Sequence, residues 1–185
     1  MNFFSKDRQS AFDAKETAQW IAFGPVIFQA ARVLRNTGIL SAIDDSQSEG
    51  ITLEAIAQKT KVSEYGVRVL LESALSTGMV LVNDKKYTLG KVGHFILHDP
   101  LTKVNMDFVH DVNYKGLFYL DKSIETGKPE GLKEFGEWKT IYEALSKLPP
   151  HVQESWFNFD HYFSDDAFPL VLPLVYGDGS VKKLI

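Results

Sequence analysis

Two short amphipathic stretches separated by a tight turn constrain the fold of this chain more than any other feature. The first stretch, residues 52–59, begins with Thr52, and the second, residues 63–75, begins with Ser63. Both residue types are favoured at helix N-caps, because their side-chain oxygens accept backbone N–H groups that the first turn leaves unbonded. The pattern therefore predicts two helices in the spacing of a helix-turn-helix.

The segment after these helices has the composition of a β-hairpin. Residues 79–82 and 87–89 are rich in strand-forming side chains, and the polar residues 83–86 between them suit a turn. Two helices followed by a hairpin predict a winged helix. The fold class that we expect is mainly α, with a winged helix-turn-helix, a small β-hairpin and additional helices.

The residues before this motif, 10–40, predict two helices whose apolar side chains cover more than one face. Ile21 and Phe28 are two of the many apolar residues at helical spacing. Because proline removes a backbone donor and favours the first helical position, one helix is expected to end near Phe23 and the next to begin at Pro25. A helix that is apolar on several sides needs cover on several sides. We expect a second copy of the chain to supply part of that cover.

The second half of the chain predicts further helices. Residues 101–148 contain helical segments, and the prolines at 149–150 interrupt them. An aromatic-rich helix is expected over residues 151–162. Ser164 is then expected to cap a further helix that includes residues 168–176.

The charge pattern argues against a nucleic-acid partner. The net charge is −4, whereas proteins that hold nucleic acid by its phosphates need a concentrated positive face. The second helix of the motif carries one cation, Arg68, with Glu64 and Glu72 on either side of it. Lys85 and Lys86 at the tip of the wing are typical of a soluble turn. A winged-helix transcriptional regulator with a ligand-binding helical tail remains the alternative function.

Composition also bears on location and on metals. The apolar stretches are too short or too interrupted to span a bilayer, and the first residues do not have the pattern of a signal peptide, so we expect a cytoplasmic protein with no membrane partner. The chain has no cysteine, which excludes thiolate ligands. His94 and His98 are four residues apart, but the sequence His98-Asp99-Pro100 favours a loop there. We therefore expect no metal site.

Several pieces, in their order along the chain, resemble the S-adenosylmethionine-dependent O-methyltransferases that carry a winged-helix dimerisation domain. Thr37-Gly38-Ile39-Leu40 is similar to the turn that ends the opening helix of that family, with Thr37 in place of a leucine. A second similar piece ends in Thr126-Gly127-Lys128-Pro129. The residues that carry the resemblance are 24–40, 53–57, 69–80, 87–89 and 117–129.

The resemblance implies a domain organisation and a function. It implies a winged-helix dimerisation domain at residues 1–100, a helical acceptor-pocket and linker region at 101–176, and the start of a Rossmann-like cofactor-binding domain at 177–185, where residues 181–185 read as the beginning of a strand. It also implies a homodimer through the N-terminal helices and methyl transfer from S-adenosylmethionine to a hydroxyl of a small aromatic acceptor. We expect no catalytic and no cofactor-binding residue in this chain, and therefore no activity of the chain alone.

Four residues of the aromatic-rich helix are candidates for binding the acceptor, because the resemblance implies that this helix contributes to the acceptor pocket. They are Phe157, Asp160, His161 and Tyr162. The spacing places Phe157, Asp160 and His161 on one helical face. Aromatic rings suit a flat acceptor, and a histidine suits proton transfer or a hydrogen bond to a phenolic oxygen. The alternative is that His161 is a structural residue of an aromatic cluster.

Overall fold

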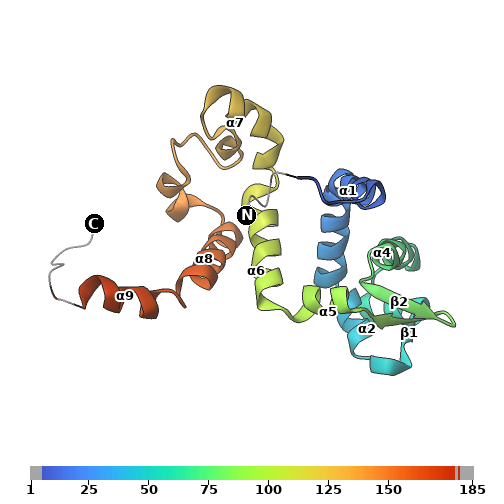
Figure 1. The fold of residues 1–185 in the computed structure, drawn as a ribbon. Coiled ribbons are helices and arrows are strands. Elements are labelled where there is room, and N and C mark those ends of the chain that lie inside the picture. Colours follow the sequence, from blue (N-terminus) through green and yellow to red (C-terminus); the bar gives the residue numbers. More distant parts are fainter. Residues whose placement is uncertain (1–5, 178, 180–185) are drawn as a thin grey trace. The chain divides into compact units, whose positions relative to one another are not determined.

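Most of the chain is helical, and the strands form one small antiparallel sheet among the residues that the structure describes (Figure 1). The structure is a computed structural model, and it describes residues 6–177 and 179. It divides into two compact units, unit 1 (Met1–His98) and unit 2 (Asp99–Ile185). The strand expected at residues 181–185 lies outside the described residues. Within the described residues, none of the helices has the length and apolar character needed to cross a bilayer.

Unit 1 contains the helix-turn-helix and hairpin region. The sheet has the order β1-β3-β2, and Val82 pairs with Tyr87 across the hairpin. The elements are α1 (Ala11–Asn36), α2 (Ile39–Asp44), a 3₁₀ turn (Gln47–Glu49), β1 (Ile51–Thr52), α3 (Leu53–Thr60), α4 (Glu64–Ser76), β2 (Val80–Asn83), β3 (Lys86–Leu89) and α5 (Lys91–His98).

The predicted helix caps of unit 1 are confirmed. The Thr52 hydroxyl oxygen accepts from the Ala55 N–H at 3.3 Å at the start of α3, and the Ser63 oxygen accepts from the Gly66 N–H at 3.1 Å at the start of α4. The predicted hairpin is also present, whereas β1 was not predicted. The finer assignment of this region as a winged helix stays a prediction.

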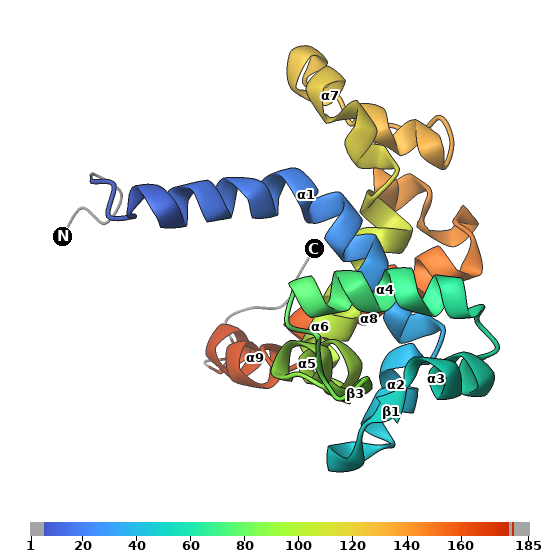
Figure 2. The same cartoon turned by 90° about the vertical axis from the view of Figure 1, so that its right-hand side faces the viewer.

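The prediction of two helices on either side of Pro25 is wrong, because α1 continues through that proline. A proline inside a helix removes one backbone hydrogen bond and clashes with the preceding turn, which bends a helix without necessarily ending it. Figure 2 shows that α1 changes direction partway along its length. The long helix ends where Gly38 adopts a φ of 79°, a left-handed conformation that glycine accepts at little cost.

The core of unit 1 is aliphatic and tightly closed. Helix α2 packs against α1, α3, β3 and α5, so it lies at the centre of the unit. The largest fully buried side chains of the unit come from α1, α2, α3, α4, β2 and the residue before β2: Leu34, Ile39, Leu40, Ile43, Ile56, Val67, Leu71, Met79 and Val80.

Unit 2 is assembled from shorter and less regular helical pieces. Asp99 begins the unit as the N-cap of its first helix and accepts from the Thr102 N–H at 2.7 Å. The elements are α6 (Pro100–Phe108), a π-helical segment (Val109–Asn113), α7 (Leu120–Thr126), α8 (Pro150–Ser164), α9 (Phe168–Tyr176) and 3₁₀ turns at Gly116–Tyr119, Glu130–Glu134, Ile141–Glu143 and Leu145–Lys147.

The helix predicted over residues 168–176 is present as α9, but the predicted cap is wrong. Ser164 belongs to the end of α8, and its hydroxyl donates to the Asp160 carbonyl at 2.7 Å. Ala167, which has no side-chain acceptor, stands at the N-cap of α9. The serine is therefore used by the preceding helix.

Candidate functional site

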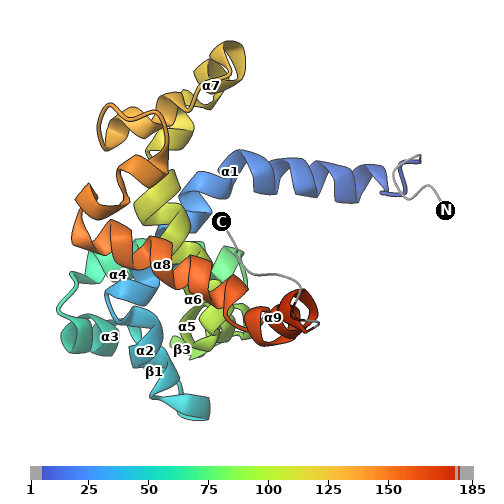
Figure 3. The same cartoon turned by 90° about the vertical axis from the view of Figure 1, so that its left-hand side faces the viewer.

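Helix α8 has two different faces, and the inner one is used for packing. Figure 3 shows α8 beside α6, and the two helices are in contact. The ring of Phe159 stacks on Phe108 of α6 with centroids 4.0 Å apart, and Trp156 lies 5.6 Å from the same ring. Ser155 is buried, and its hydroxyl donates to the Asp111 carboxylate at 2.6 Å. These contacts fix the orientation of α8 within unit 2.

The four candidate residues lie on the outer face of α8. Phe157 and Tyr162 are each 42% exposed, and Asp160 and His161 are also exposed. Aromatic density in this helix therefore serves two purposes, with Trp156 and Phe159 turned to the core and the candidates turned away from it. The roles of Phe157, Asp160, His161 and Tyr162 in binding an acceptor stay predictions.

His161 has a local partner on this outer face. Its Nδ1 lies 2.9 Å from the Asp165 carboxylate, one helical turn further along the chain. The hydrogen bond to Asp165 and then the charge of that carboxylate raise the pKa of His161, and Asp160 adds to the effect. His161 therefore holds its proton to a higher pH than an isolated imidazole does. This property suits it to contact an anionic or phenolic oxygen.

A small cavity lies on the inner side of unit 2. Its volume is about 290 Å³, close to the lower end of the usual range of ligand pockets. Asn113 of the π-helical segment, Phe135 and Trp156 are among the side chains that line it. None of its lining residues, within the described part of the chain, has an ionisable side chain. The cavity therefore has the composition of a binding pocket for a flat apolar molecule and offers no acid or base.

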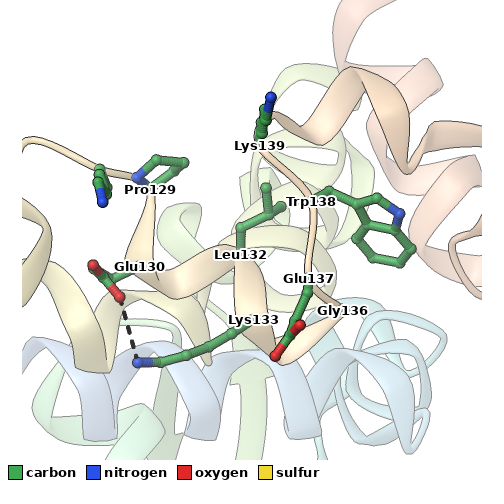
Figure 4. A pocket seen from close by; sticks show the side chains of 9 residues that line it. Pro129, Glu130, Leu132, Lys133, Gly136, Glu137, Trp138 and Lys139 are labelled. Atoms are coloured by element: carbon green, nitrogen blue, oxygen red, sulfur yellow. Dashed lines mark ion pairs between the residues drawn. The ribbon is translucent and has the colours of Figure 1, made fainter.

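A second, larger hollow of about 490 Å³ is formed by the loop that follows α7. Figure 4 shows Pro129, Leu132 and Trp138 around it, with Lys133 directed toward Glu130 at 3.7 Å. The Lys133 ammonium also lies 4.1 Å from the centre of the Tyr119 ring. Pro129 and Leu132 line both cavities, so the loop forms part of the wall of each.

The sequence did not predict these cavity residues. They come from a π-helical segment, 3₁₀ turns and a loop, which carry little of the periodicity by which helices and strands are found. The one available signal was glycine: Gly116 and Gly131 approach so closely that a side chain on Gly131 would meet the Gly116 backbone. Of the four predicted site residues, none is among the residues that line these two cavities of the described chain.

Comparison with known proteins identifies the region that contains α1 and the sheet. Residues 15–87 match the family model described as Dimerisation2-like domain. The chain is 22% identical over 173 residues to the L-tyrosine C(3)-methyltransferase of Streptomyces lavendulae, an alignment that covers 91% of this chain and 46% of that protein.

Solved structures show the same fold. The S-adenosylmethionine-dependent methyltransferase SibL has a TM-score of 0.68 at 21% identity, over 84% of this chain and 46% of that chain. The mitomycin 7-O-methyltransferase MmcR has a TM-score of 0.63 at 20% identity, over 80% of this chain and 43% of that chain. The chain thus spans about half the length of these relatives.

These matches confirm the predicted resemblance to S-adenosylmethionine-dependent methyltransferases that carry a dimerisation domain. The relatives named above are methyltransferases. They give no support to the alternative of a DNA-binding transcriptional regulator.

Proposed function

We propose that this chain, as a member of the S-adenosylmethionine-dependent methyltransferases, is the dimerisation and acceptor-binding portion of an enzyme that methylates a hydroxyl of a small aromatic molecule. The observation that carries the proposal is the dimerisation-domain match over residues 15–87, because it includes a helix with an uncovered apolar surface. The relatives differ in the atom that they methylate: the L-tyrosine C(3)-methyltransferase is named for a carbon and MmcR for an oxygen. The acceptor hydroxyl is supported by MmcR, and His161, whose pKa the Asp165 carboxylate raises, is a side chain that could contact its oxygen.

The dimer is argued from the uncovered side chains of α1. Trp20, Ile21, Phe23 and Val26 are all large, apolar and exposed in unit 1, and Ile21 is 75% exposed. Soluble proteins rarely leave so many neighbouring apolar side chains in water unless they form an interface. A second copy that covered this surface would remove the cost of hydrating it.

A hollow between α1 and α4 also supports this surface of α1 as the dimer interface. Its volume is about 520 Å³, and Trp20, Phe23 and Val26 of α1 line it together with Ser73 and Ser76 of α4. A helix packing against another inserts its side chains into such grooves. The α1 helix of a second copy has suitable apolar residues to fill it.

The acceptor is proposed to meet unit 2 at α8. Phe157 and Tyr162 offer ring faces, while Asp160 and His161 offer polar contacts to a hydroxyl or phenolate. In this arrangement the chain binds and orients the acceptor.

S-adenosylmethionine is the cofactor that we propose for the whole protein, since SibL is described as dependent on it and LepI, a further structural neighbour with a TM-score of 0.65, was solved with it. The described residues of this chain do not fit that role. Gly177 follows helix α9, whereas the loops that hold such cofactors follow a strand. We therefore assign no catalytic or cofactor-binding residue here.

Sedimentation equilibrium of the 185-residue chain tests the dimer. We expect the wild-type chain to be a dimer at about 10 µM, the range of a moderately stable interface. The substitution Ile21→Glu places a charge in the interface and should weaken association by about 30-fold or more, which corresponds to roughly 2 kcal/mol.

The matched control is Ile124→Glu in α7, because Ile124 is 79% exposed and lies in unit 2. It should leave the dimer intact, and circular dichroism should show that both variants keep their helices. A wild-type chain that remains a monomer at high concentration would contradict the proposal, as would equal weakening by both substitutions.

A further inference from the structure

Three side chains of the types that bind metal ions meet in unit 1. They are Asp44 at the end of α2 and His94 and His98 on α5, and their ligand atoms all lie within 4.8 Å of one another. The His98 Nε2 lies 2.8 Å from the Asp44 carboxylate, and the two imidazole rings have centroids 4.7 Å apart.

The backbone explains why the histidines converge. The sequence favoured a loop at His98-Asp99-Pro100, but α5 remains helical through His98 and α6 begins at Pro100. Residues four apart on a helix lie on the same face, so His94 and His98 project side by side. Helix α2 packs against α5, which brings Asp44 to that face.

We propose that Asp44, His94 and His98 form a binding site for a divalent transition-metal ion, with Zn²⁺ as the natural occupant. Two imidazole nitrogens and one carboxylate oxygen are a ligand set that zinc accepts, and three protein ligands leave a fourth position for water. A hollow of about 540 Å³ borders Asp44 and His94 and gives that fourth position access to solvent.

Binding of a zinc ion would require little rearrangement of the three side chains. Metal–ligand bonds of about 2.0–2.1 Å in a tetrahedron place the ligand atoms about 3.3 Å apart. The present separations, from 2.8 Å for His98 and Asp44 up to 4.8 Å, lie on both sides of that value. Both histidines are exposed, so rotation about their side-chain bonds can close the remaining gap without moving the backbone.

The competing explanation is that Asp44 and His98 form a simple hydrogen-bonded pair that links α2 to α5. That pair does not involve His94, which faces the hollow and stands beside the pair. His94 therefore distinguishes the two explanations, because a metal site needs it and the hydrogen bond does not. The bound ion would connect α2 to α5 and stabilise unit 1 against heat.

Titration calorimetry with ZnCl₂ on the tag-free full chain is the test. We expect one Zn²⁺ per chain with a Kd of about 10 µM, which corresponds to a binding free energy of about 7 kcal/mol. His94→Ala should weaken binding by about tenfold or more, and so should His98→Ala and Asp44→Asn. Co²⁺ in place of Zn²⁺ should give visible absorption bands that His94→Ala abolishes.

His161→Ala is the matched control. His161 and Asp165 are also an imidazole and a carboxylate in contact, but they offer a metal ion two ligands instead of three. This substitution should leave the zinc affinity within about twofold of the wild type. Circular dichroism should show that every variant stays folded. A Kd that His94→Ala does not change, or no saturable binding below about 1 mM Zn²⁺, would overturn the site.

Discussion

Units 1 and 2 differ in how they bury apolar surface. Among the described residues, fifteen of the twenty buried hydrophobic residues lie in unit 1 and five lie in unit 2. Unit 1 closes an aliphatic core around α2, whereas unit 2 packs Phe108, Trp156 and Phe159 as stacked and tilted rings beside small cavities. A closed core makes a rigid support, and rings with gaps between them can accommodate a ligand.

The same contrast appears outside the core. Unit 1 exposes a row of apolar side chains on the first part of α1, which is suited to another protein surface. Unit 2 presents an outer face on α8 that mixes rings with His161 and Asp160, which is suited to a small polar aromatic molecule. The two surfaces are thus suited to different kinds of partner and lie in separate units of the chain.

Core truncation in unit 1 should have the largest effect on stability, and it tests whether the two units unfold independently. Leu71→Ala removes a fully buried side chain of α4 and should lower the free energy of unfolding of unit 1 by about 3 kcal/mol. Hydrogen exchange resolved by segment should show loss of protection in unit 1. Leu148→Ala, in the core of unit 2, is the control and should affect unit 2. Equal loss of protection in both units after Leu71→Ala would show that they unfold as one.

Substitution of a glycine in unit 2 should have an intermediate effect on stability, and it tests how tightly two loops of that unit pack. Gly131→Ala would place a methyl group against the backbone of Gly116, which should cost about 1–3 kcal/mol in the stability of unit 2. Gly24→Ala in α1 is the control, because nothing lies within 4 Å of the added carbon. Hydrogen exchange resolved by segment measures both, because Gly131 and Gly24 lie in different units. A neutral Gly131→Ala would mean that the two loops separate easily.

Removal of the Asp165 carboxylate should have the smallest effect on stability and a clear effect on titration. Asp165→Asn should lower the pKa of His161 toward its ordinary value, because the first cause of the raised pKa is the hydrogen bond to that carboxylate. Since the folded pKa is raised, the pair stabilises the protein at pH below the unfolded pKa, and this contribution fades as pH rises through the folded value.

Histidine NMR titration gives that pKa directly. Asp166→Asn is the control, because Asp166 is a neighbouring exposed carboxylate that is not among the causes of the raised pKa. An unchanged pKa of His161 in Asp165→Asn would show that the pair does not persist in solution.

Local rules predicted unit 1 better than unit 2. Thr52 and Ser63 act as caps because N-capping depends on a few adjacent residues, and the hairpin forms because the turn residues Asp84 and Lys85 adopt positive φ. Pro25 misled the prediction because the remaining hydrogen bonds of a long helix carry it past one missing donor.

The site was harder to predict for a physical reason. Which face of α8 is buried depends on α6, more than forty residues earlier, and sequence periodicity in a helix so rich in aromatic residues does not decide it. The meeting of Asp44 with His98 is likewise a tertiary contact across 54 positions. Such contacts are specified by the packing of whole helices.

Disulfide cross-linking is the most direct test of the claim that α1 of unit 1 is where two copies meet. The chain has no cysteine, so single substitutions report on one surface each. We predict that Ile21→Cys forms a covalent dimer on mild oxidation and that the matched Ile124→Cys in unit 2 remains monomeric in denaturing gels. Equal cross-linking of the two variants would contradict the account.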